Sequence, residues 1–212
     1  MLVSRMLQLD HLVYGVPDLE QGINDLEKLL GVRAIFGGQH KGIGTHNALL
    51  ALSKNSYLEI IAPDPLQQPF GKSMWFGVHN LSQPKLLTYA IKSNNISEQL
   101  DQARQLGFQL GDVQKGSRDK PDGTRLSWQL TNPSELIEGG VVPILIDWGD
   151  SAHPAESITA ICELINLEAT HPHAEDLNQK LNAMNVWMKC SQGEEKKLTA
   201  TLNTPKGIVT LS

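Results

Sequence analysis

The chain has 212 residues, of which 40% are hydrophobic and 19% charged, a balance typical of a soluble globular protein with a sizeable core. Its net charge of −5, without a long basic run, argues against a nucleic-acid or anionic-membrane surface. Two cysteines, Cys162 and Cys190, are too few for a disulfide framework and lack metal-site spacing. No secretory leader and no apolar stretch of ~20 residues is visible, so we expect a cytoplasmic protein.

The chain begins with a predicted strand followed by a helix. Leu9–Val16 is apolar and typical of a buried strand. Asp18 is placed to cap a helix, with Gln21 at the capping-box position, and Gly31 supplies the stop. Between them one face repeats apolar residues at helical spacing: Leu19, Ile23, Leu26, Leu29 and Leu30.

Three shorter strands are expected to follow this helix. They are Ala34–Phe36, His46–Leu52 and Tyr57–Ala62, which complete a βαβββ unit. The next segment, residues 66–84, is rich in glutamine, proline and glycine but carries aromatic side chains that need burial. We therefore interpret it as an ordered connection.

The same order of elements is predicted a second time. Leu86–Lys92 is an apolar strand, Asn95 caps a helix with Glu98 at the box position, and Gly107 ends it. The helical apolar positions repeat the spacing of the first helix: Ile96, Leu100, Ala103 and Leu106. Three predicted strands follow: Phe108–Val113, Thr124–Leu130 and Val141–Trp148.

A third, more polar copy closes the chain. It has a strand at Ile158–Leu167, an amphipathic helix and three further predicted strands: Val186–Cys190, Lys197–Leu202 and Gly207–Leu211. His171 and His173, before the helix, are expected to face solvent.

A supersecondary unit that recurs every few tens of residues indicates an internally repeated fold. We predict an α+β class of repeated βαβββ modules in one compact body: module one, residues 1–65; a connector, 66–85; module two, 86–156; and module three, 157–212. Each unit exposes one apolar sheet face that needs a partner. The first two are expected to pair as a cupped half-barrel, with the third appended.

Four motifs in this chain resemble those of the glyoxalase-like domain family, part of the vicinal oxygen chelate superfamily. They are Leu-Asp-His-Leu-Val with its Val-Pro-Asp corner, Gly44–Leu50, Tyr57–Pro65 and Asp147–Ala155. The resemblance extends over roughly residues 8–167. It implies paired βαβββ modules, a cup that often holds a divalent metal, and ligands on the first and last strands of each module.

Carried onto this sequence, the resemblance places metal ligands at His11 and Glu59 in module one. The matching positions of module two are Thr88 and a residue near Ile146 or Asp147, and Thr88 departs from the expected histidine. A histidine and a carboxylate suit zinc, manganese, nickel or iron. From either residue alone, the favoured interpretation is structural: an edge-strand Glu59 in solvent and a hydrogen-bonded core His11. The resemblance favours a pocket that contains both.

His153, in Ser-Ala-His-Pro-Ala, follows the strand that should close module two. It is predicted as a third metal ligand or a general base, because histidine titrates near neutrality. The alternative is a loop histidine before a turn proline. Glu59 and His153 are thus the candidate catalytic residues.

Five residues are predicted to contact a ligand: His46, Asn47, Thr88, Asp147 and Trp148. His46 and Asn47 follow a glycine pair that could expose backbone N–H groups, although a hairpin alone explains the same pattern. Asp147 and Trp148 stand at a strand end, where a turn cap and a core residue are the alternatives. His40 and His79 belong to no recognisable constellation.

The sequence leaves the function between two main classes. The first is a divalent-metal-dependent lyase, isomerase, dioxygenase or hydrolase acting on a small oxygenated substrate. The second is a metal-free protein that binds or sequesters a small molecule. A structural role with the modules serving a homodimer is a third.

Overall fold

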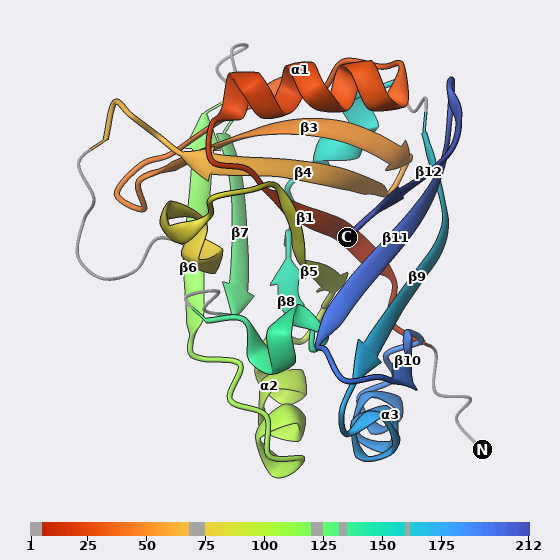
Figure 1. The fold of residues 1–212 in the computed structure, drawn as a ribbon. Coiled ribbons are helices and arrows are strands. Elements are labelled where there is room, and N and C mark those ends of the chain that lie inside the picture. Colours follow the sequence, from red (N-terminus) through yellow and green to blue (C-terminus); the bar gives the residue numbers. More distant parts are fainter. Residues whose placement is uncertain (1–5, 68–74, 120–124, 132–134, 160–161) are drawn as a thin grey trace.

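The structure, a computed structural model, describes residues 6–67, 75–119, 125–131, 135–159 and 162–212 (Figure 1). Module one contains β1 (Leu9–Gly15), α1 (Leu19–Leu30), β2 (Ile35–His40), β3 (Thr45–Ser53) and β4 (Ser56–Pro63). Module two contains β5 (Lys85–Lys92), α2 (Ile96–Gln105), β6 (Val113–Asp119), β7 (Arg125–Thr131) and β8 (Ile144–Asp147). Module three contains β9 (Glu163–His171), α3 (Ala174–Ala183), β10 (Lys189–Gln192), β11 (Lys197–Thr204) and β12 (Gly207–Leu211).

The predicted helix caps are confirmed. The Asp18 side chain accepts a hydrogen bond from the Gln21 backbone N–H at 2.8 Å, and the Asn95 side chain accepts one from the Glu98 N–H. Gly31 is left-handed, with φ of 79°, and its N–H bonds the carbonyl of Glu27. Each contact satisfies a backbone group that the helix end leaves unpaired, so α1 and α2 begin where the sequence predicts.

Modules one and two form one eight-stranded sheet in the order β2-β3-β4-β1-β5-β8-β7-β6. Within each module the first strand pairs in parallel with the last, and antiparallel β1 and β5 join the modules. The sheet curls until its edge strands meet, where the Arg118 guanidinium of β6 donates to the carbonyl of Gly37 on β2. The predicted α+β fold with two modules paired around a cup is confirmed.

Module three forms a separate four-stranded sheet in the order β10-β9-β11-β12. Its βαβββ element order agrees with the prediction, but its pairing differs from that of the other modules. Here the first strand, β9, pairs in parallel with the second, β10, and antiparallel with β11. This sheet lies on the side of the molecule opposite β6 and β7 (Figure 1).

Several predicted elements are wrong in extent. Phe108 and Leu110 are buried, but they lie in the loop before β6, which begins only at Val113. The predicted strand Val141–Trp148 shortens to β8, after a 3₁₀ turn at Ile137–Gly140. In both places apolar side chains enter the core from irregular backbone, so an apolar run alone misleads. Another 3₁₀ helix, Trp75–Asn80, lies in the connector, whose residue Phe70 falls outside the described residues.

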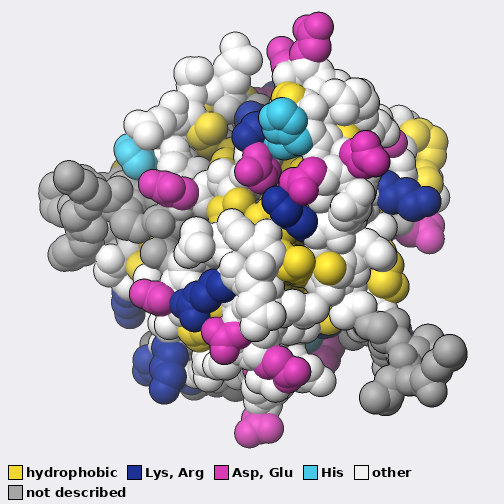
Figure 2. Space-filling model, turned by 90° about the horizontal axis from the view of Figure 1, so that it is seen from below, with side chains coloured by type: hydrophobic (Ala, Val, Ile, Leu, Met, Phe, Trp, Pro, Cys, Tyr) yellow, Lys and Arg dark blue, Asp and Glu magenta, His cyan; other side chains and the backbone are white. Residues whose placement is uncertain are grey.

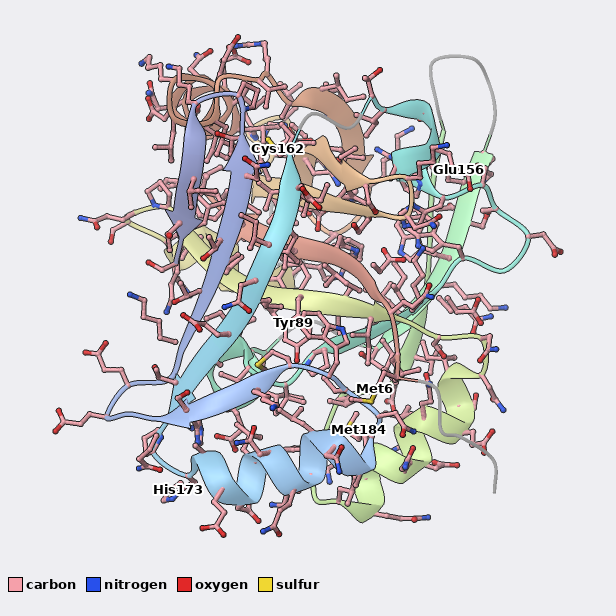
Figure 3. The ribbon with its side chains drawn as sticks, turned by 90° about the vertical axis from the view of Figure 1, so that its right-hand side faces the viewer. Met6, Tyr89, Glu156, Cys162, His173 and Met184 are labelled. Atoms are coloured by element: carbon pink, nitrogen blue, oxygen red, sulfur yellow. The ribbon has the colours of Figure 1, made fainter. Side chains whose placement is uncertain are left out.

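The hydrophobic core has two sides. The larger cluster joins the convex face of the sheet to the three helices and to the strands of module three. In Figure 1, α1 crosses above β3 and β4, while α2 and α3 lie together at the opposite end. Figure 3 shows Cys162 and His173 near the two ends of β9, and Met184 beside Met6. Because helices and the second sheet cover the convex face, the concave face is left for a site.

The surface agrees with the composition. On the face seen in Figure 2, Lys and Arg side chains alternate with Asp and Glu, and hydrophobic side chains appear only in small patches. No helix in the described part of the chain is both long and apolar enough to span a membrane.

Candidate functional site

A small cavity lies on the concave face of the eight-stranded sheet, between the two modules. Its volume is about 30 Å³, room for about two water molecules. Module one contributes His11, His40, Asn47, Leu49, Tyr57 and Glu59; module two contributes Arg118, Trp128, Leu130, Ile144 and Ile146, with Trp148 beyond them and Trp75 and Phe76 from the connector. Apart from Arg118, the charged and polar side chains are therefore concentrated on the wall from module one.

Asp10 is the centre of the hydrogen-bond network behind that wall. Its side chain is fully buried and accepts from His11 Nδ1 at 2.8 Å, from Trp148 Nε1 at 3.0 Å and from His153 Nε2 at 3.2 Å. Burial alone would raise the pKa of Asp10, but the hydrogen bonds and positive potential of His11 and His153 hold it well below the usual range. Asp10 is thus an ionised carboxylate throughout the neutral range.

The bond to Asp10 fixes the tautomer of His11. An ionised carboxylate only accepts hydrogen bonds, so in the neutral imidazole of His11 the proton is on Nδ1 and the lone pair on Nε2. That Nε2 lies 3.8 Å from Oε2 of Glu59, and Tyr57 stacks on the ring with centroids 4.7 Å apart. His11 therefore presents a basic nitrogen to the cavity from a rigid position.

Glu59 is held from the opposite side by Asn47. Asn47 Nδ2 donates to Glu59 Oε1 at 2.5 Å and lies 3.3 Å from His40 Nε2, while His40 Nδ1 bonds the Thr45 hydroxyl at 2.8 Å. Burial lowers the pKa of His40 to about 4, and the negative charge of Glu59 offsets only part of this shift. His40 is therefore neutral at physiological pH and serves as a hydrogen-bond partner.

Arg118 brings a positive charge to the rim of the cavity. Burial lowers the pKa of its guanidinium, and the charges of Tyr57 and Glu59 oppose that shift. Among the described residues it forms no ion pair, and its one hydrogen bond goes to the carbonyl of Gly37. A Cβ at residue 37 would lie 2.3 Å from Asn47 Oδ1 and 2.8 Å from Arg118 Nη1, so only glycine leaves room for both. Asn47 Oδ1 is buried and has no hydrogen-bond partner among the residues that the structure describes.

The structure brings only part of the predicted site together. His11, Glu59, Asn47 and Trp148 line the cavity. His153 does not join His11 and Glu59, because its Nε2 bonds Asp10 and its Nδ1 accepts from the Ala155 N–H. In this structure His153 supports Asp10, and its predicted role as a metal ligand stays a prediction.

The other predicted ligand contacts lie elsewhere. The Thr88 hydroxyl donates to the carbonyl of Gly140 at 3.0 Å, away from the cavity. His46 lies on the face of β3 opposite Asn47, with its ring edge to Phe36. Asp147 caps a turn by accepting a hydrogen bond from the Gly149 N–H.

One further prediction, outside the cavity, is wrong. His171 was expected to face solvent, but its side chain is buried and forms a hydrogen bond of 2.9 Å with Glu138.

A chelated divalent metal does not fit this set of donors. No three His, Cys, Asp or Glu side chains among the described residues are grouped closely enough to hold an ion. Asp10 and His153 are committed to each other, and the module-two wall opposite His11 and Glu59 is formed by apolar side chains such as Ile144 and Ile146. Only two donors of the expected set remain.

Comparison of the sequence with models of protein families identifies the family of this chain. The model of the glyoxalase-like domain matches residues 9–184. The chain belongs to the glyoxalase-like domain family. This family is part of the vicinal oxygen chelate superfamily, as the motifs around His11 and Glu59 indicate. Among curated proteins, none matches this member of the family in sequence.

Solved structures share the fold of this glyoxalase-like chain at low sequence identity. A hypothetical protein from Staphylococcus aureus matches with a TM-score of 0.65 and 13% identity over 91% of this chain and 88% of its own. Methylmalonyl-CoA epimerase from Mycobacterium tuberculosis matches with a TM-score of 0.43 and 19% identity, over 70% of this chain and 93% of its own. At these identities the similarity concerns the fold alone.

Asp10, His40 and Arg118 were missed by sequence reasoning. Asp10 precedes His11 on the same strand, so regular alternation would send the two side chains to opposite faces. A register shift against β5 between Leu9 and His11 lets the two side chains meet. The Asp-His pair inside an apolar strand was the available signal, since a buried charge needs a partner.

Proposed function

We propose that this protein is an enzyme that transfers a proton at a carbon atom next to a carbonyl group of a small oxygenated substrate. The observation that carries the proposal is the position of His11 Nε2, 3.8 Å from the Glu59 carboxylate on the wall of a small cavity, with buried Asp10 behind it. Isomerases and lyases that form an enolate use this arrangement of a base, a second proton carrier and a stabilising positive charge.

Each residue then has a defined part. His11 Nε2 accepts the proton, and the carboxylate of Asp10 stabilises the imidazolium that forms without taking its proton. Glu59 Oε2, which receives no hydrogen bond from a described residue, lies 3.8 Å from this nitrogen on the same wall and is the second group that gives or takes a proton. The positive charge of Arg118 favours the negative oxygen that develops on the substrate.

The cavity favours this reaction over simple sequestration of a ligand. Pockets that bind whole small molecules occupy about 300–1,000 Å³, whereas this cavity holds about 30 Å³. Only the reacting end of a substrate fits there, and the burial of His11, Glu59 and Asp10 strengthens the interactions of their charges. A cytoplasmic location and a homodimer stay predictions.

The test is hydrogen–deuterium exchange at carbon, followed by proton NMR in D₂O with a panel of small 2-oxo acids, hydroxyketones and thioesters. We expect the wild-type protein to accelerate exchange in at least one of them. His11→Gln and Glu59→Gln are each expected to lower that rate roughly 10²–10⁴-fold. His46→Gln, a histidine on the other face of β3, is the matched control and should retain the rate. Exchange that is unaffected in His11→Gln would contradict the assignment.

We also expect the protein to function without a resident metal. After dialysis, elemental analysis should find zinc, manganese, nickel and iron well below one ion per chain, because only His11 and Glu59 remain of the expected ligands. Chelator should leave the melting temperature unchanged. One equivalent of metal that disappears in His11→Ala would contradict the poor fit and restore the metal-dependent alternative.

A further inference from the structure

A second, larger hollow adjoins the cavity on the outside of the cup. This groove has a volume of about 540 Å³ and runs between β2 and β6, the two edges of the sheet. His40, Trp75, Arg118 and Trp128 line both the groove and the cavity. These four side chains therefore form the wall between the space where a reacting group fits and the space where the rest of a molecule could lie.

The groove is basic in an acidic protein. Of the described residues that line it, four are lysine or arginine and none is aspartate or glutamate: Lys41, Lys115, Arg118 and Arg125. The chain as a whole carries a net charge of −5. Within the part of the chain that the structure describes, the exposed side chains of Lys41 and Lys115 form no ion pair with an acidic residue. Such a concentration of positive charge attracts anions.

Arg118 is the strongest element of this surface. A guanidinium has five N–H donors in a planar fork that matches the oxygens of a carboxylate or phosphate. In the described structure only Nη1 is used, on the carbonyl of Gly37, so the remaining donors are open to a ligand. A partly buried cation whose donors are mostly unpaired loses hydration without compensation, and an oxyanion would supply it.

The charges also determine which end of a substrate goes where. The cavity contains Glu59, with ionised Asp10 behind it, so a second negative group there would be repelled. The groove has the opposite sign. A molecule with an anionic group and a carbonyl group is therefore oriented with its anionic group in the groove, next to Arg118. Its reacting carbon then lies in the cavity.

The geometry points to the groove between β2 and β6 as the binding site for an oxyanion of the substrate, a carboxylate or a phosphate, held by Arg118 with Lys41 and Lys115 at its rim. The inference rests on the proposed function only in assigning the bound anion to the substrate. The anion site itself is defined by the residues of the groove. It narrows the substrate class to small anionic carbonyl compounds.

The test is isothermal titration calorimetry of the full chain with sodium pyruvate, inorganic phosphate and pyruvamide, the neutral amide of pyruvate. We expect both anions to bind and pyruvamide to bind at least about tenfold more weakly, a difference of about 1.4 kcal/mol. Binding of pyruvate alone would identify a carboxylate site, and stronger binding of phosphate a phosphate site. Higher salt should weaken both.

Variants separate this site from the catalytic pair. Arg118→Gln and the double variant Lys41→Gln/Lys115→Gln should each weaken anion binding, the first by about tenfold or more. Arg118→Lys retains the charge but not the fork, and we expect intermediate binding even if Arg118→Gln folds poorly. Arg104→Gln, an exposed arginine paired with Asp101 on α2, is the control.

The result that overturns the inference is equal binding of pyruvate and pyruvamide by the wild type, or anion binding that both groove variants retain. His11→Gln distinguishes this failure from failure of the proposed function. If the anion site is real and the proton-transfer assignment wrong, His11→Gln binds pyruvate as the wild type does and no variant affects exchange. If only the anion site is wrong, exchange depends on His11, while anion binding is the same in the wild type and in both groove variants.

Discussion

Asp10→Asn is expected to lower the free energy of unfolding by about 3 kcal/mol or more. Three donors, from His11, His153 and Trp148, converge on the two oxygens of this buried carboxylate. Asparagine keeps the shape but replaces one oxygen with an NH₂ group, which must then face a donor and leaves buried N–H groups unpaired. Urea unfolding at neutral pH, with the slope compared between variants, measures the difference.

The control for this prediction is Asp25→Asn. Asp25 also accepts two hydrogen bonds, from Gln21 and Lys28, but its side chain is 54% exposed on α1. Substitutions at such surface positions usually change stability by about 0.5 kcal/mol or less. If Asp10→Asn were as stable as Asp25→Asn, Asp10 would not be the ionised centre of the network.

Acidification is expected to destabilise the wild-type protein more than the His40→Gln variant. The folded pKa of His40, about 4, lies below the value of 6.5 that the histidine has when unfolded. The unfolded chain therefore binds the proton first, and the stability that neutral His40 contributes above pH 6.5 is lost as the pH falls through 4. The loss approaches about 3 kcal/mol, since each pKa unit corresponds to about 1.4 kcal/mol.

The measurement is the free energy of unfolding from denaturant titrations at several pH values in this window. His40→Gln changes packing as well, but only the slope with pH is compared. His79→Gln removes an exposed histidine outside the cavity and should retain the wild-type slope. Asp10 does not contribute to the pH dependence in this window. Because its pKa is lowered in the folded state, its own contribution is lost only below pH 3.8. Parallel curves for the wild type and His40→Gln would contradict a buried neutral His40.

Local signals in the sequence were sufficient for most of the fold. Caps such as Asp18 and Asn95 act within a few residues of their partners, so the chain encodes them directly. The paired modules follow from the repetition of those signals. Glu59 and His11 were indicated by the resemblance to the glyoxalase-like family, and the apolar neighbours of both residues agreed with a buried position.

The rest of the site depends on irregular backbone and on closure of the sheet. Gly37 and Gly38 suggested that the strand ends at Phe36, but β2 continues to His40 through a register shift at Phe36/Gly38. That continuation brings His40 into the cup. Arg118 reaches the cavity only because β6 meets β2, two edges separated by the whole width of the sheet. Neither event leaves a pattern in the local sequence.

The unequal walls of the cavity have a practical consequence for engineering. The two groups that exchange protons, His11 and Glu59, come from module one, whereas Trp128, Leu130, Ile144 and Ile146 of module two form an apolar surface with no part in the proton transfer. A library that varies these four positions can therefore enlarge or reshape the space for new substrates. Because such changes leave Asp10, His11 and Glu59 in place, selectivity and reactivity can be evolved separately in this scaffold.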